Sequence, residues 1–106
     1  MRALFEVPGV FDDLRDGHKW ISEGGQPTAA DRMLVAYDWV TQRLCEQPGM
    51  GKLFGPELPE VRMRGLPSPF HWYQVFYRFD AETVRVLAVI HGARGDETRW
   101  ADLRGR

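Results

Sequence analysis

PFHWYQVFYRFDAETVRVLAVIHGAR, residues 69–94, reads as two adjacent strands joined by a tight acidic turn. Residues 70–79 and 83–91 are dominated by Phe, Tyr, Trp, Val and Thr, which favour extended structure. The three residues between them match the length of a hairpin connection. This hairpin gathers aromatic and cationic side chains on one small sheet, a surface suited to nucleic acid or to a protein that handles it. They are Tyr73, Tyr77, Arg78, His91 and Arg94.

Alternation along the strands separates two faces of this hairpin. Both faces are partly apolar, so alternation alone leaves two assignments open. We expect the face that carries Val84, Val86 and Ile90 to pack on helices. That choice turns Arg85 and His91 toward solvent or toward a partner.

Two amphipathic helices precede the hairpin. The first starts near residue 8 and stops at Gly24-Gly25, with an apolar stripe at spacings of three and four. The second runs from Pro27 to about Pro48, and only a few residues separate the two, so they should lie antiparallel. The stripe of the first helix consists of Val7, Phe11, Leu14, His18 and Ile21. That of the second consists of Ala29, Met33, Ala36, Val40 and Leu44.

The remaining segments complete the expected topology. Residues 3–7 form a short edge strand, residues 48–60 read as a Gly- and Pro-rich loop, and residues 60–64 form another strand. The tail, residues 96–106, could add a helical turn or two. We therefore expect one domain, residues 1–106, of α+β class in the order β-α-α-β-β-β. Its helical hairpin packs on one face of a small antiparallel sheet, and the opposite face stays open to solvent or a partner.

Composition limits the function classes. The net charge of −1 argues against a dedicated nucleic-acid binder, yet residues 1–60 carry six Lys/Arg against ten Asp/Glu, and residues 61–106 carry eight Arg against five. An acidic and a basic half indicate two different partner surfaces. The single cysteine, Cys45, fits a reducing cytoplasm. No window approaches the apolar run of about eighteen residues that a membrane span requires. We expect a cytoplasmic protein without a membrane partner.

Scattered histidines and one cysteine give no metal-ligand spacing, so we expect no metal and no cofactor. Trp20 and Trp39 lie off the apolar stripes of their helices. They either anchor a partner helix in a groove or pack against the neighbouring helix, and both interpretations stay open.

The C-terminal half contains, in this order, Phe76-Tyr77-Arg78, the acidic turn, residues 84–89, His91-Gly92-x-Arg94 and Trp100. This order resembles that of the RelE/ParE toxins of bacterial type II toxin–antitoxin systems. Asp13-Leu14 and the Ala29-Ala30-Asp31-Arg32 run agree with it in the N-terminal half. It implies the same fold and a cognate antitoxin partner, for which Trp20 and Trp39 are the candidate contacts.

Two mechanisms occur in that family. The His-Gly-x-Arg ending is similar to the ParE branch, which implies inhibition of DNA gyrase with no need for an acid–base pair. Target-binding residues would then be Tyr73, Tyr77, Arg78, His91 and Arg94. The resemblance therefore favours a non-enzymatic toxin.

The alternative is a RelE-like endoribonuclease that cleaves mRNA on the ribosome. Attack of a 2′-oxygen on its phosphate needs a base, an acid and cations that stabilise the phosphorane. The matching positions here would be His91, Arg62, Arg64 and Arg78. The only lysines, Lys19 and Lys52, lie outside the expected strands.

Overall fold

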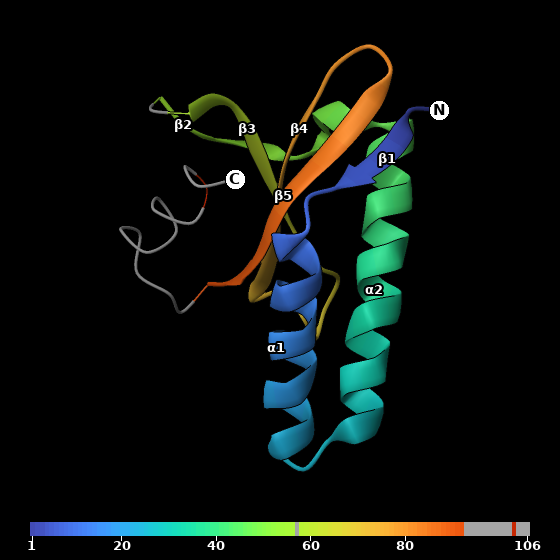
Figure 1. Cartoon of the computed structure of the whole chain (residues 1–106), viewed down its shortest axis with the longest axis vertical. Coiled ribbons are helices and arrows are strands. Elements are labelled where there is room, and N and C mark those ends of the chain that lie inside the picture. The colour runs from blue at the N-terminus through green and yellow to red at the C-terminus, as the bar shows by residue number, and fades with distance from the viewer. Residues whose placement is uncertain (57, 93–102, 104–106) are drawn as a thin grey trace.

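The computed structural model describes residues 1–56, 58–92 and 103, and it places two helices against one five-stranded sheet (Figure 1). Its elements confirm the α+β class and the helical hairpin. In chain order they are β1 (Ala3–Glu6), α1 (Gly9–Glu23), α2 (Pro27–Glu46), the 3-10 turn η1 (Pro48–Met50), β2 (Lys52–Gly55), β3 (Leu58–Gly65), β4 (Tyr73–Phe79) and β5 (Thr83–His91).

The sheet has the order β1-β5-β4-β3-β2 and is mixed. Strands β2 to β5 pair antiparallel, as expected, but β1 runs parallel to β5, with Ala3 opposite Thr83 and Glu6 opposite Val86. The expectation of a purely antiparallel sheet was wrong on this point. A parallel neighbour requires a crossover connection, and the helical hairpin between β1 and the later strands supplies it.

Two strand boundaries differ from the expected ones. The segment 48–60, expected as a loop, contains η1 and β2, a four-residue edge strand too short to show alternation. Strand β4 begins at Tyr73 instead of residue 70. The amide of Phe70 donates to Pro67 O, and the amide of Tyr73 donates to Phe70 O, so the segment before β4 folds as turns.

The helices lie side by side and antiparallel along one face of the sheet (Figure 1). On α1 the buried stripe is offset from the expected one, because Val10 and Gly17 point inward whereas Phe11 is 58% exposed. Leu14 and Ile21 continue the stripe at helical spacing. The buried side chains of α2 are those of Ala30, Met33, Tyr37, Val40, Thr41, Leu44 and Cys45.

A β-bulge in β5 decides which side chains face the helices. Phe76 pairs with Ala88 and Tyr77 with Val86, so Leu87 is an extra residue in β5. After Leu87, each side chain of β5 therefore points to the opposite face from the one that simple alternation predicts. Val84 and Val86 lie on the face covered by the helices, as expected, but Ile90 lies on the other face. His91, expected to point away from the helices, lies instead on the face that they cover.

The second face of the sheet is also covered, so the expectation of an open face was wrong. Phe76 and Ala88 are fully buried, and Ile90 is nearly so. The ring of Phe54 on β2 meets Phe76 edge to face at 5.5 Å between centroids. Leu103, the one described residue of the C-terminal tail, is buried in the same core.

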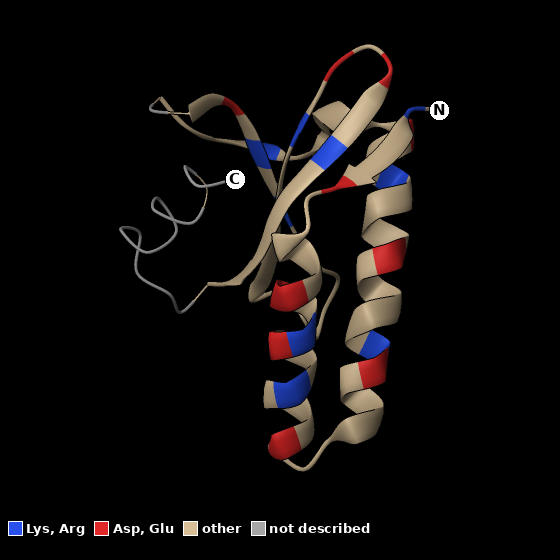
Figure 2. Cartoon of the chain, viewed as in Figure 1, with Lys and Arg blue, Asp and Glu red and all other residues tan. Residues whose placement is uncertain are grey.

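Charged residues of both signs recur along α1 and α2 (Figure 2). None of the described helices combines the length and the apolarity needed to cross a membrane. Within the described residues, no three His, Cys, Asp or Glu side chains lie together as metal ligands would.

Candidate partner-binding site

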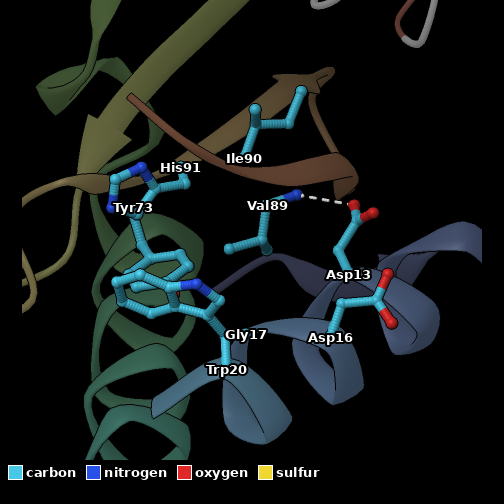
Figure 3. Close-up of a pocket in the computed structure, with 8 residues that line it drawn as sticks. All are labelled: Asp13, Asp16, Gly17, Trp20, Tyr73, Val89, Ile90 and His91. Carbon is cyan, nitrogen blue, oxygen red and sulfur yellow. Dashed lines mark hydrogen bonds between the residues drawn. The ribbon is translucent and has the colours of Figure 1, made fainter. Parts of the chain in front are cut away.

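A cavity of about 330 Å³ opens where α1 meets the end of the β4–β5 pair (Figure 3). Three rings border it on one side, two carboxylates border it on the other, and the Val89 side chain lies between them. The described residues that line it include no lysine and no arginine. The lining consists of Asp13, Asp16, Gly17, Trp20, Tyr73, Val89, Ile90 and His91.

The β-bulge at Leu87 brings the rings together. Because the bulge shifts the alternation of side chains along β5, His91 lies opposite Tyr73 on the face covered by the helices. The two rings meet edge to face, with their centroids 4.9 Å apart. Trp20 reaches over from α1, its ring 5.8 Å from His91 and tilted by 53°. An aromatic corner is therefore built from three separate elements. Two of its members, Tyr73 and His91, are residues that the sequence singled out for target binding.

Gly17 allows α1 to approach this corner. A Cβ at residue 17 would lie 3.2 Å from the Tyr73 ring and 3.3 Å from the Met33 methyl group. Both contacts are tighter than ordinary van der Waals packing. Burial raises the pKa of Tyr73, so its phenol stays neutral at physiological pH.

The acidic side of the cavity comes from α1. Oδ2 of Asp13 accepts a 2.9 Å hydrogen bond from the amide of Val89, which lies beyond the last residue that pairs with β1. Asp13 thus provides the hydrogen-bond acceptor for the Val89 amide, which has no partner on β1. Asp16, one turn further along, is exposed. Among the described residues it makes neither a hydrogen bond nor an ion pair.

A larger groove of about 940 Å³ adjoins the cavity. Trp20, Tyr73 and His91 border both spaces, and Trp72, which is 59% exposed, forms part of the groove wall. The sequence predictions included neither Trp72 nor the acidic pair Asp13 and Asp16 in the site. A signal was present, because residues 13, 16, 17 and 20 repeat at helical spacing and share one face of α1.

Tyr77 lies elsewhere. Its side chain is 0% exposed, and its hydroxyl donates to Pro48 O at 2.6 Å and accepts from the Gly51 amide at 3.0 Å. The expected outward orientation was therefore wrong. The bulge places Tyr77 opposite Val86 on the helix face, where the backbone of residues 48–51 surrounds the hydroxyl. Burial raises the pKa of this phenol.

The three arginines of the ribonuclease alternative do not meet His91. Arg62 donates to Gly51 O at 2.8 Å, and Arg64 is exposed two residues along β3 on the same face. Arg78 points to the opposite face and pairs loosely with Glu60 at 3.9 Å. His91 lies at the other end of the β4–β5 pair from Arg78. Arg94 lies outside the described residues.

Trp20 and Trp39 are both exposed, at 68% and 47%. They lie toward opposite ends of the helical hairpin, since each is near the C-terminal end of its own helix and the helices are antiparallel. The Arg43 guanidinium lies over the Trp39 ring at 5.2 Å. Phe11 and Val35, which the sequence predictions did not place on the surface, are further exposed apolar residues on the helices.

Comparison with known proteins identifies consistent relatives. The family described as "ParE toxin of type II toxin-antitoxin system, parDE" matches residues 8–95. Toxin ParE2 of Mycobacterium tuberculosis is 32% identical over 106 residues, which covers 99% of this chain and 95% of the relative. A solved structure titled "Chromosomal ParDE TA system from P. aeruginosa" matches with a TM-score of 0.71 and 16% identity, over 86% of this chain and 96% of that one. At this identity the structural match concerns the fold alone.

Proposed function

The chain belongs to the ParE toxin family of type II toxin–antitoxin systems, and from this premise we propose that it inhibits DNA gyrase and is neutralised by a cognate antitoxin of the ParD type. The family match across residues 8–95 carries the proposal. The solved relative named above comes from a ParDE system, which supports an antitoxin partner for this chain as well.

The geometry at His91 supports a non-enzymatic toxin over a ribonuclease. Cleavage of RNA through its 2′-oxygen needs cations placed around one phosphate, together with an acid and a base. Here Arg62 and Arg64 lie on one face of the sheet and Arg78 on the other, and His91 lies at the opposite end of the β4–β5 pair from Arg78. No arginine lines the cavity beside His91 among the described residues.

The target-binding residues in this proposal are Tyr73 and His91, which line the cavity, together with Arg78 and Arg94. Tyr77 acts indirectly, because its buried hydroxyl holds residues 48–51 against the sheet. The antitoxin covers the outward side of the helices, where Trp20 and Trp39 supply large apolar contacts. A cytoplasmic location stays a prediction.

Supercoiling of relaxed plasmid by gyrase, with the purified chain added, tests the proposal. We expect loss of supercoiling and accumulation of cleaved DNA, and reversal of both effects by the antitoxin. Unimpaired supercoiling at a large excess of the chain would contradict it. Primer extension on translated mRNA provides the comparison, since codon-phased cleavage that disappears in His91→Ala would favour the ribonuclease.

A further inference from the structure

The cavity between Trp20 and Asp16 has the composition of a site for a cation. It combines three π faces with two carboxylates and contains no lysine or arginine among its described lining residues. Aromatic faces attract cations through their quadrupole, and carboxylates add direct charge attraction. Oδ2 of Asp13 accepts the hydrogen bond from the Val89 amide. Asp16 has no partner among the described residues.

We infer that this cavity binds an arginine side chain of the antitoxin, and this inference rests on the antitoxin proposed above. The guanidinium stacks against the Trp20 and Tyr73 rings and donates to the Asp16 carboxylate, while the methylene stem lies on Val89. Figure 3 shows rings and carboxylates on opposite sides of Val89, as this arrangement requires. Arginine fits better than lysine because its planar group both stacks and donates two parallel hydrogen bonds.

Two observations favour the antitoxin as the source. The cavity adjoins the larger groove and shares Trp20, Tyr73 and His91 with it, so a side chain inserted in the cavity can belong to a polypeptide segment that lies in that groove. The α1 side of the cavity is also acidic, since Asp13 and Asp16 line it and no lysine or arginine does among the described residues. A cationic segment is therefore attracted to this end of the helical hairpin.

This placement gives the antitoxin a direct means of neutralisation. Tyr73 and His91 line the cavity and are also the proposed contacts for gyrase. An arginine seated there covers both rings, so the chain cannot engage its target while the antitoxin is bound.

The first test uses N-acetyl-L-arginine methylamide as the probe and the citrulline analogue as its neutral control. Amide chemical shifts of Gly17, Val89 and His91 are followed in the full-length chain. We expect saturable shifts with the arginine probe and at least tenfold weaker binding of the citrulline probe. Asp16→Asn should weaken arginine binding at least fivefold. Asp12→Asn is the matched control, because Asp12 lies on the same helix, pairs with Arg15 and does not line the cavity.

Equal shifts with the two probes, or equal losses in the two variants, would overturn the inference. A circular dichroism spectrum of each variant checks that both remain folded. The second test titrates a ParD-type antitoxin that neutralises this chain against the same variants, with about tenfold weaker binding expected for Asp16→Asn only. These measurements contain no gyrase. If the chain binds the arginine probe but does not inhibit gyrase, only the proposed function is rejected. If it inhibits gyrase but does not bind the arginine probe, only this inference is rejected.

Discussion

Tyr37 and Glu6 join α2 to β1: the Tyr37 hydroxyl donates a 2.6 Å hydrogen bond to Oε2 of Glu6. The tether matters because β1 has four residues and, among the described strands, pairs with β5 alone. Burial and the neighbouring Glu6 carboxylate raise the pKa of Tyr37 far above its usual value. The hydroxyl therefore remains a donor at any physiological pH.

Replacing Tyr37 by Phe removes this donor and leaves the partly buried Glu6 carboxylate without it. A hydrogen bond to a charged group contributes about 1.5–3 kcal/mol, so we expect the free energy of unfolding to fall by that amount in urea titrations. Tyr37→Phe made in a Glu6→Gln background should cost less. Strictly additive losses in this double-mutant cycle would show that the pair does not interact in solution.

All three tyrosines make stability sensitive to alkaline pH. Tyr37, Tyr73 and Tyr77 each have a pKa raised by burial, so the folded state keeps protons that the unfolded state releases. Stability is fully present below the unfolded pKa of about 10 and falls as pH rises above it, by up to about 1.4 kcal/mol per pH unit for each tyrosine. Burial also raises the pKa of the Cys45 thiol, so Cys45 too lowers stability as pH rises. Its effect begins at a lower pH than that of the tyrosines, because an unfolded thiol titrates below a phenol. Urea midpoints measured between pH 8 and 11 check this, and a flat profile would contradict it.

Tyr77 and Tyr73 form a matched pair for testing which tyrosine hydroxyl stabilises the fold. Tyr77→Phe breaks two hydrogen bonds and leaves Pro48 O and the Gly51 amide without their partner, so we expect a loss of about 1–3 kcal/mol. The hydroxyl of Tyr73 makes no hydrogen bond among the described residues. Tyr73→Phe should therefore change stability by less than about 0.5 kcal/mol. Equal losses for the two variants in urea unfolding would contradict this assignment.

The hairpin of helices and the strands around residues 73–91 could be predicted from sequence because their periodicities are strong. The orientation of single side chains could not. One extra residue, Leu87, reverses the alternation of β5, and no local signal distinguishes it from its apolar neighbours. This one feature moved Ile90 to the far face and brought His91 to the cavity. Strand β2 was missed because four residues between glycines and prolines carry no usable pattern.

The cavity itself was only half predictable. Tyr73, His91 and Trp20 were identified from the sequence, although for different partners, and the structure brings them together. Asp16 and Gly17 were not identified, since their roles depend on the contact between α1 and β5. From the sequence, Gly17 only lowers the helix propensity of its segment. Its role in letting α1 approach Tyr73 is seen only in the structure.

Gly17→Ala tests that close approach. Helix propensity alone would stabilise the chain by about 1 kcal/mol, but the added Cβ meets the Tyr73 ring at 3.2 Å and the Met33 methyl group at 3.3 Å. Because overpacking costs about 1–3 kcal/mol, we expect net destabilisation in thermal or urea unfolding. Gly49→Ala, where a Cβ meets nothing within 4 Å, should change stability little. A more stable Gly17→Ala variant would mean that α1 can shift away from the sheet without cost.

Trp39 offers a test of the proposed antitoxin surface away from the cavity. Its ring is 47% exposed beside Arg43, and Phe11 and Val35 are further exposed apolar residues on the helices. Large aromatic anchors at protein interfaces commonly contribute about 2 kcal/mol or more, so Trp39→Ala should weaken antitoxin binding about thirtyfold in calorimetry. Leu53→Ala is the control, since Leu53 is 60% exposed on β2, at the sheet edge opposite β1 (Figure 1). Weakening by Leu53→Ala with no effect of Trp39→Ala would place the antitoxin on the sheet edge instead of the helices.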